Sequence, residues 1–73
     1  MYLLDTDVCI YLLRGRAPAV AERLRNLPLE EIGTTAITVA ELRYGALRST
    51  RPRENVRRVD LFVAPLTVLP FDQ

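Results

Sequence analysis

The sequence predicts an α/β protein, with helices and a mostly parallel sheet arranged as three α/β/α layers. The main observation is alternation: short apolar runs that suit strands are separated by longer segments whose apolar residues recur at helical spacing. Strands separated by a helix are joined by a crossover, and crossovers connect parallel strands. The 73 residues contain no repeat, low-complexity stretch or linker, so we expect them to lie within one domain.

The first strand and the first helix are predicted to meet at a polar cluster. Residues 2–4 are a continuous apolar run, which is typical of a strand buried on both faces. Asp5, Thr6 and Asp7 follow this run, and their short polar side chains can cap a helix over residues 8–14. The chain is therefore expected to turn from strand to helix at this cluster.

Further strands and helices follow in alternation. Residues 32–37 and 67–69 suit strands, although Gly33 weakens the first of them. Helices are expected to begin at Pro18 and Pro52, because proline is tolerated in a first helical turn. The apolar residues expected to face inward from the helices after residue 17 are Val20, Leu24, Leu27, Val39, Leu42, Ala46, Val56, Val59 and either Phe62 or Val63.

The last residues resemble the beginning of another element. Phe71, Asp72 and Gln73 follow the third expected strand, and Asp72 suits the N-cap of a helix. A parallel sheet of three strands would leave an edge and a face uncovered. We therefore expect residues 1–73 to be the N-terminal portion of a single larger domain whose C-terminal part is absent. A complete miniprotein is the alternative.

Composition excludes several classes of chemistry. The chain has no histidine and one cysteine, which excludes a disulfide scaffold, a zinc finger and a Ser-His-Asp triad. A net charge of +1 excludes a strongly basic nucleic-acid binder. Cys9 lies in an apolar run and is expected to be a buried side chain in a reducing compartment. With neither a transmembrane run nor a secretory leader, the protein is expected to be cytoplasmic. Because the chain has no histidine and its one cysteine is expected to be buried, carboxylates must carry any catalysis.

Asp5 is the first candidate for chemistry, because it follows the first expected strand directly. Ligands of open parallel sheets bind at the carboxyl ends of the strands. A carboxylate there suits Mg²⁺ or Mn²⁺, which prefer oxygen donors. The alternative is that Asp5 only caps the following helix, but Thr6 or Asp7 could do this alone.

Glu41 is the second candidate. A helix is expected to begin at Thr38, and Thr38-x-x-Glu41 has the spacing of a capping box. The same helix follows a parallel strand, however, so its N-terminus should lie at the same sheet edge as Asp5. Glu41 is off the apolar stripe, and Gly45 leaves space one turn later. Two carboxylates at one sheet edge would form half of a cation site.

An arginine cluster is the third feature. It is opposed within its span only by Glu54, which also has the spacing of an ion pair with Arg58. The cluster could contact a phosphate backbone, form a solvated face or dock an acidic partner. Its members are Arg43, Arg48, Arg51, Arg53, Arg57 and Arg58.

Three segments together resemble a known family. Residues 2–10, Tyr-Leu-Leu-Asp-Thr-Asp-Val-Cys-Ile, resemble the opening of PIN domains. Residues 38–45, Thr-Val-Ala-Glu-Leu-Arg-Tyr-Gly, resemble their second motif, Ser/Thr-x-x-Glu-Leu with a small residue one turn later. Residues 68–72, Val-Leu-Pro-Phe-Asp, resemble the third strand and following helix start of VapC-type toxins. The segments occur in the family's order and span essentially the whole chain.

This resemblance implies a Mg²⁺- or Mn²⁺-dependent endoribonuclease toxin, usually dimeric and inhibited by a VapB-type antitoxin. Asp5 and Glu41 match the first two acidic metal ligands, with Thr6, Asp7 and Thr38 as supporting polar neighbours. The remaining acidic ligands of PIN domains follow a further helix, so residues 1–73 are expected to be inactive alone. The expected contacts to RNA or antitoxin are Arg43, Arg48 and Arg51.

Two alternatives remain from the sequence. Asp5-Thr6-Asp7 after an apolar strand also resembles phosphatases of the haloacid dehalogenase type, although Cys9 stands where these have Thr or Val and the chain has no lysine. The other alternative is a binding or dimerisation module that uses its apolar helix faces and its arginines. Such a module should tolerate substitution of Asp5 and Glu41.

Overall fold

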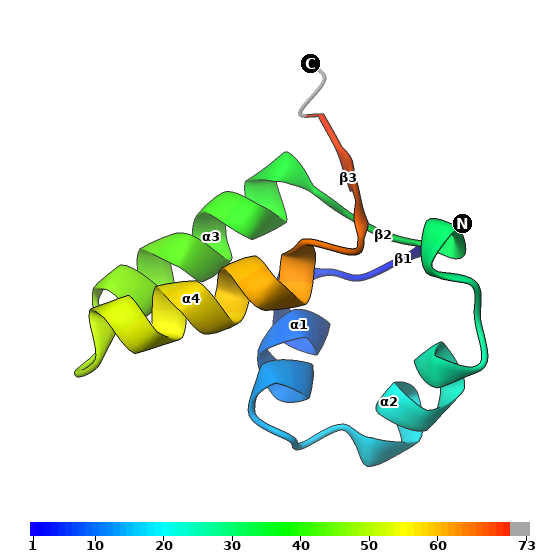
Figure 1. Cartoon of the computed structure of the whole chain (residues 1–73), viewed down its shortest axis with the longest axis horizontal. Coiled ribbons are helices and arrows are strands. Elements are labelled where there is room, and N and C mark those ends of the chain that lie inside the picture. The colour runs from blue at the N-terminus through cyan, green and yellow to red at the C-terminus, as the bar shows by residue number, and fades with distance from the viewer. Residues whose placement is uncertain (71–73) are drawn as a thin grey trace.

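The computed structural model describes residues 1–70, and it is an α/β structure in which helices flank a small sheet (Figure 1). The expected helix start at Asp72 lies outside the described residues. None of the helices among residues 1–70 is long and apolar enough to cross a membrane. The elements are β1 (Tyr2–Leu3), α1 (Thr6–Leu13), α2 (Pro18–Arg25), the 3₁₀ helix η1 (Leu29–Glu31), β2 (Ile32–Thr35), α3 (Ala36–Leu47), α4 (Pro52–Val63) and β3 (Thr67–Leu69).

The three strands form a parallel sheet in the order β1-β2-β3, which confirms the predicted fold class. Gly33 in the central strand pairs with Leu3 on one side and with Thr67 on the other. A Cβ at this position would lie 2.8 Å from Met1 Sδ and 2.9 Å from the Thr67 carbonyl oxygen. Glycine at position 33 therefore lets the neighbouring chain approach closely.

The first strand differs from the prediction. We expected a strand buried on both faces, but Tyr2 is 38% exposed and Leu3 is 53% exposed, and only Leu4 is buried. Among the described residues β1 pairs with β2 alone, so it lies at an edge of this sheet. The apolar run of residues 2–4 therefore does not form a strand enclosed on both faces.

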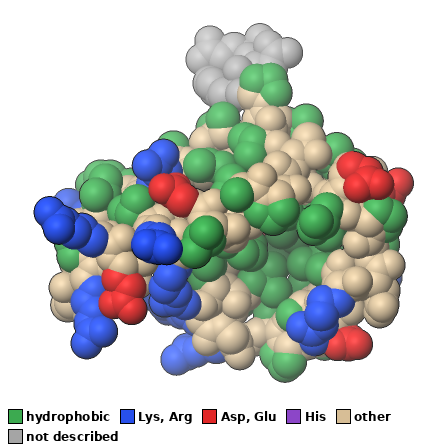
Figure 2. Space-filling model, viewed as in Figure 1, with side chains coloured by type: hydrophobic (Ala, Val, Ile, Leu, Met, Phe, Trp, Pro, Cys, Tyr) green, Lys and Arg blue, Asp and Glu red, His purple; other side chains and the backbone are tan. Residues whose placement is uncertain are grey.

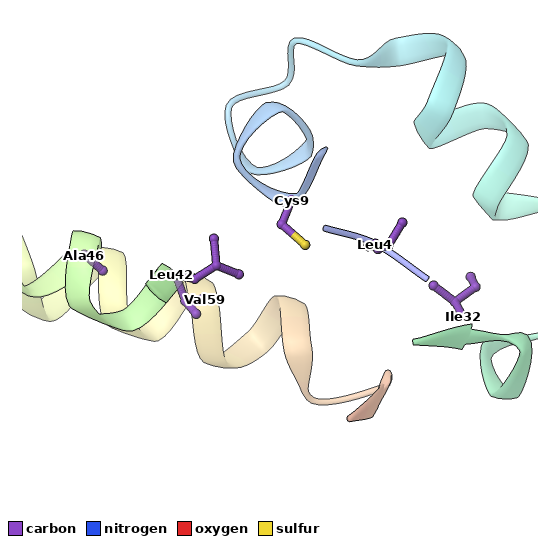
Figure 3. Packing of buried hydrophobic residues seen from close by; sticks show 6 residues of the cluster. All are labelled: Leu4, Cys9, Ile32, Leu42, Ala46 and Val59. Atoms are coloured by element: carbon purple, nitrogen blue, oxygen red, sulfur yellow. The ribbon is translucent and has the colours of Figure 1, made fainter. Parts of the chain in front are cut away.

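The core lies where α1, α3 and α4 pack together below the sheet (Figure 3). Helices α3 and α4 lie side by side, and α1 contacts both of them (Figure 1). As predicted, Leu42 and Ala46 of α3 face Val59 of α4 in this core, while Val56, Phe62 and Val63 are partly buried. The buried hydrophobic core residues are Leu4, Cys9, Ile32, Leu42, Ala46 and Val59.

Two buried polar groups lie under the end of β1. Burial raises the pKa of the Cys9 thiol from 9.0 to about 11, and this effect exceeds that of a hydrogen bond with Thr34 that lowers the pKa. The Thr34 hydroxyl donates to the Leu4 carbonyl oxygen at 2.8 Å, which ties β2 to the residue after β1. Cys9 is therefore the inert buried thiol that the sequence predicted, because it stays protonated near neutral pH.

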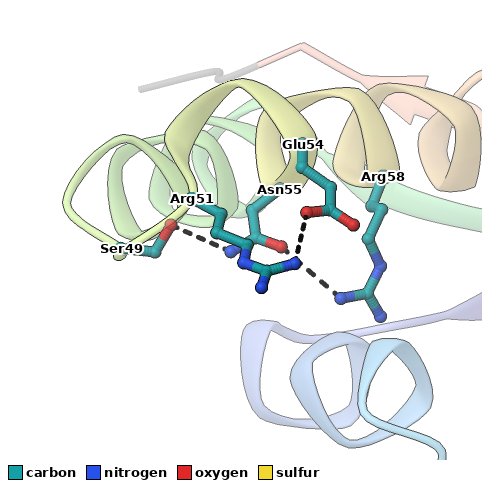
Figure 4. Close-up of polar contacts among 5 residues, drawn as sticks. All are labelled: Ser49, Arg51, Glu54, Asn55 and Arg58. Carbon is teal, nitrogen blue, oxygen red and sulfur yellow. Dashed lines mark hydrogen bonds and ion pairs between the residues drawn. The ribbon is translucent and has the colours of Figure 1, made fainter.

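The predicted ion pair between Glu54 and Arg58 is not formed, although α4 begins at Pro52 as predicted. Glu54 instead accepts from Arg51, at 3.3 Å. Arg58 donates to the Leu13 carbonyl oxygen of α1 at 2.5 Å. The packing of α1 against α4 places a carbonyl oxygen within reach of Arg58, and this contact replaces the local pair. In Figure 4, Glu54 pairs with Arg51 and not with Arg58.

Candidate functional site

Asp5 is the N-cap of α1. Its backbone is extended, with φ −83° and ψ 175°, and its Oδ1 accepts a hydrogen bond from the Val8 backbone N–H at 2.9 Å. We expected Thr6 or Asp7 to be able to supply this cap, and that expectation is wrong because Thr6 is already the first residue of the helix. The bond uses only Oδ1 of an exposed carboxylate, so Oδ2 can still bind a cation.

Glu41 has no part in a capping box. Helix α3 begins at Ala36, and its N-cap is Thr35, whose hydroxyl oxygen accepts from the Thr38 backbone N–H at 3.2 Å. The predicted cap at Thr38 is therefore wrong, and the strand predicted over residues 32–37 ends at Thr35. Thr38 lies inside the first turn and Glu41 one turn further along α3, so Glu41 is too far along the helix to cap it.

The structure brings the two acidic motifs together through Thr6. The Thr6 hydroxyl donates to Glu41 Oε1 at 2.6 Å, although the two residues are 35 positions apart. Thr6 Oγ1 also lies 3.3 Å from the hydroxyl oxygen of buried Thr38, and Thr35 Oγ1 lies 3.3 Å from the same oxygen. We call Asp5, Thr6, Thr38 and Glu41 the edge site, because Asp5 and α3 both follow the ends of paired parallel strands.

Asp7 does not join the edge site in the same way. Its side chain is exposed in the first turn of α1. Within residues 1–70 it forms no hydrogen bond with Asp5, Thr6 or Glu41. The expected supporting role of Asp7 therefore stays a prediction.

The donor set of the edge site consists of oxygen atoms only. Two carboxylates and neighbouring hydroxyls suit a hard cation such as Mg²⁺ or Mn²⁺, and the only thiol in the chain is the protonated Cys9 side chain. Among the described residues there is no group of three or more acidic, histidine or cysteine side chains that could hold a metal. Asp5 and Glu41 therefore fit a divalent ion as part of a ligand set.

The three arginines singled out in the sequence are exposed and have partners on α3 or α4. Arg43 pairs with Asp60 at 3.5 Å, and Arg51 pairs with Glu54 at 3.3 Å. Arg48 lies over the Tyr44 ring, 5.4 Å from its centroid. We call Arg43, Arg48 and Arg51 the arginine surface; Figure 2 shows the basic side chains gathered over the α3–α4 part of the molecule.

Sequence reasoning missed a cleft that shares Glu41 with the edge site. The cleft has a volume of about 240 Å³ and lies between α1, α3 and α4, with Arg14, Asn55 and Arg58 among its lining residues. The sequence had singled out Arg58 as a member of the arginine cluster, but no pattern joined it to Arg14 and Asn55, because these residues meet only when α1 packs against α4. The nearest sequence signal was Gly45, which we expected to leave space and which lines this cleft.

Comparison with known proteins identifies relatives over nearly the whole chain. The model of the PIN domain family matches residues 2–73. The chain is 34% identical over 97% of its length to the tRNA(fMet)-specific endonuclease VapC of Shigella flexneri, and 36% identical over 96% to Ribonuclease VapC2 of Haemophilus influenzae. These alignments cover 53% and 52% of the relatives, so the chain spans about half the length of the curated relatives it matches.

Solved structures agree with the sequence matches. The chain superimposes on DNA-bound VapBC from Salmonella typhimurium with a TM-score of 0.87 and 35% identity, covering 99% of this chain and 54% of that one. For VapBC-1 from nontypeable Haemophilus influenzae the TM-score is 0.79 and the identity 34%, covering 99% and 55%. At identities of 34% and 35%, these matches support membership of the same family as well as a shared fold.

Proposed function

The chain belongs to the PIN-domain family, and from that premise we propose that it is the N-terminal portion of a divalent-metal-dependent endoribonuclease, the toxin of a VapBC-type pair. Similarity to ribonucleases named VapC over 97% of the chain supports this activity. The observation that carries the proposal is the 2.6 Å bond from Thr6 to Glu41, because it joins the segment that follows Asp5 to the second acidic motif.

We propose that Asp5 and Glu41 hold a Mg²⁺ or Mn²⁺ ion through their carboxylate oxygens. When bound, such an ion activates water for attack on a phosphodiester and stabilises charge on the phosphate oxygens. Thr6 fixes the orientation of the Glu41 carboxylate by donating to Oε1, which leaves Oε2 free. Thr38 is buried beside Thr6 and limits its movement, so the carboxylate has a defined direction before any ion arrives.

Two carboxylates are a weak set for this chemistry. Mg²⁺ requires near-octahedral oxygen coordination and is lost readily when few ligands are charged. We propose that further acidic ligands of the same PIN-like domain come from outside residues 1–73, and that the 73-residue chain alone is not a competent nuclease. This proposal is consistent with the relatives, which are about twice as long as the segment matched.

The proposed partners are an RNA substrate, a VapB-type antitoxin and a second copy of the toxin, in the cytoplasm. Support for the antitoxin comes from the similar solved structures, which are VapBC complexes. Arg43, Arg48 and Arg51 remain proposed contacts to RNA or antitoxin. Exposed ion pairs such as Arg51–Glu54 contribute little to stability, so these arginines can exchange an acidic neighbour for a phosphate at low cost.

A chimera tests the activity. We would replace the matching segment of the Salmonella typhimurium relative with this chain and measure RNA cleavage in Mg²⁺ or Mn²⁺. We expect cleavage that falls by at least about 100-fold on Asp5→Asn or Glu41→Gln, since each change removes a charged ligand. Asparagine is as good an N-cap as aspartate, so Asp5→Asn should preserve the start of α1.

Glu30→Gln is the control for the chimera, because it removes an exposed carboxylate on η1 that is not part of the edge site. It should keep most of the activity. A folded chimera that does not cleave RNA would contradict the ribonuclease proposal, and metal-dependent cleavage that survives Asp5→Asn would contradict the assigned site.

The two alternatives from the sequence differ in how well they fit. In a phosphatase Asp7 would be the general acid, but the family match and the Thr6–Glu41 bond give Glu41 a place that the phosphatase scheme lacks. The binding-module alternative is compatible with antitoxin binding. It predicts that partner binding tolerates substitution of Asp5 and Glu41 but fails on substitution of arginines or core residues, which a binding assay with these variants tests.

A further inference from the structure

The cleft beside the edge site is lined by both apolar and basic side chains. Its floor is apolar and is formed by core side chains such as Ile10, Leu42 and Val59. Its rim carries Arg14 at the end of α1 and Arg58 on α4. Glu41 lines the same cleft, so the cleft begins at the carboxylate that Thr6 orients. A ligand bound at the edge site would therefore extend into a space with an apolar floor and a basic rim.

Arg58 is held in a fixed position. It donates to the Leu13 carbonyl oxygen at 2.5 Å and to Asn55 Oδ1 at 3.5 Å, and Asn55 Nδ2 donates to the Ser49 hydroxyl oxygen at 2.9 Å (Figure 4). Ser49 in turn donates to the Ala46 carbonyl oxygen at 2.6 Å. A guanidinium has five N–H donors, so these bonds orient Arg58 while leaving donors free.

The positive charge on the rim is not neutralised locally. Within residues 1–70 the ion pairs involve Arg25, Arg43 and Arg51, and neither Arg14 nor Arg58 pairs with an acidic side chain. Glu41, the acidic residue of this cleft, accepts from Thr6 instead. The rim is therefore an uncompensated pair of guanidinium groups, which favours an anionic ligand.

We infer that this cleft is a nucleotide subsite for single-stranded RNA, adjacent to the edge site. Arg14 and Arg58 would bind a phosphate next to the one cleaved, and a base would lie against the apolar floor or stack on a guanidinium plane. The inference rests on the proposed function, because the scissile phosphate is taken to lie at Asp5 and Glu41. A peptide segment of a partner protein is the competing occupant, but it would have to bring acidic groups to match both arginines.

Gly45 offers a way to fill the cleft without touching the edge site. It lies in the middle of α3, and a Cβ built there has no atom within 4 Å. Gly45→Leu should therefore project into the cleft without displacing backbone. Arg14→Gln removes one rim charge, and Arg23→Gln is its control, because Arg23 is exposed on α2 and does not line the cleft.

The test is an anisotropy titration of a fluorescein-labelled single-stranded RNA oligonucleotide with the 73-residue chain and its variants. We expect Gly45→Leu and Arg14→Gln each to weaken binding about tenfold, and Arg23→Gln to change it less than about twofold. The slope of log affinity against log salt should fall by about 0.7 for Arg14→Gln, as expected for one lost phosphate contact. Thermal unfolding of each variant checks that the fold is retained.

Several outcomes would overturn the inference. Wild-type affinity in both Gly45→Leu and Arg14→Gln, or no RNA binding by the wild-type chain, would show that the cleft is not an RNA subsite. Unchanged RNA binding together with lost antitoxin binding in Gly45→Leu would assign the cleft to a protein. Failure of the proposed function looks different: cleavage by the chimera would then be insensitive to Asp5→Asn, whatever the RNA affinity of the cleft variants.

Discussion

The edge site and the arginine surface are built on opposite principles. Glu41 in the edge site is held by Thr6 from 35 positions away, and Thr38 beside them is only 6% exposed. On the arginine surface Arg51 pairs with Glu54 three residues away, and their side chains are 76% and 59% exposed. The edge site is therefore fixed by how the sheet and helices assemble, whereas Arg48 and Arg51 of the arginine surface contact residues only three or four positions away.

This difference teaches where substitutions should matter. A group positioned by long-range packing changes when the packing changes, and its geometry costs free energy to alter. A solvent-exposed pair gains little Coulomb energy and is screened by salt. We expect the edge site to be sensitive to substitutions far from it, and the arginine surface to tolerate substitutions within it.

The largest effect should come from breaking the sheet under the edge site. Gly33→Val places side-chain atoms where the Thr67 carbonyl oxygen and Met1 Sδ already lie, and the carbonyl belongs to a paired strand. We expect the free energy of unfolding to fall by about 2–3 kcal/mol, measured by urea denaturation.

Gly45→Ala is the matched control, because a Cβ there meets nothing within 4 Å and alanine favours a helix interior. It should be neutral or stabilising by up to about 1 kcal/mol. Equal destabilisation by the two glycine variants would mean that the close approach at Gly33 does not matter.

The next effect concerns the buried thiol beside the edge site. The folded-state pKa of Cys9 is about 11 against 9.0 for a solvated thiol, so the folded state favours the protonated form. This contribution is complete below pH 9 and is lost as the pH rises towards 11. We expect about 2 kcal/mol of stability to disappear across that range.

The measurement for Cys9 is a difference between two proteins, because alkaline pH changes more than this one thiol. Urea midpoints of the wild type and of Cys9→Ala should be compared from pH 7 to pH 11. The gap between them should shrink as the pH rises. A constant gap would indicate that the thiol is not shielded from water in the folded state.

A smaller effect should follow from removing the hydroxyl that orients Glu41. Thr6→Val keeps the shape of the side chain but deletes the 2.6 Å bond to Oε1. We expect the affinity for Mn²⁺, followed by the loss of the free-ion electron paramagnetic resonance signal, to fall about tenfold. Thr6→Ser should restore most of it, since serine retains the donor. If serine and valine behave alike, the hydroxyl has no role in positioning Glu41.

The smallest effect should come from the arginine surface. Arg51→Ala removes an exposed pair with Glu54, and we expect the unfolding free energy to change by less than about 0.5 kcal/mol. The change should be smaller still in high salt, because exposed charges are screened. A loss above about 1 kcal/mol in urea denaturation would show that the arginine surface is structurally coupled to the core.

The sequence was sufficient where local chemistry decides the outcome. Strands alternate with helices as predicted, and the helices at Pro18 and Pro52 begin where proline allows. The sheet-edge argument also predicted correctly that Asp5 and Glu41 belong to neighbouring segments. The contact of Thr6 with Glu41 follows from parallel pairing, which the alternation of elements already implied.

The sequence was insufficient where the choice is made between similar local options. Thr35 and Thr38 both suit an N-cap. The pairing of β2 with β3 ends at Thr35, and the helix begins directly after it, three residues earlier than expected. The same ambiguity applies to α1, where Asp5, Thr6 and Asp7 all suit an N-cap and Asp5 takes that position. The contact from Arg58 to α1 depends on helix packing, so no short-range pattern could predict it.

The separation between Thr6 and Glu41 has a consequence for synthesis. β2 is the central strand, so β1 has no partner until a segment about thirty residues later has been made. A ribosome adds about 5–20 residues per second, so the 35 residues that separate Thr6 from Glu41 correspond to roughly 2–7 s of translation. During that interval Asp5 and Thr6 are present without their acidic partner. The nascent chain is therefore unable to assemble the edge site before α3 has emerged.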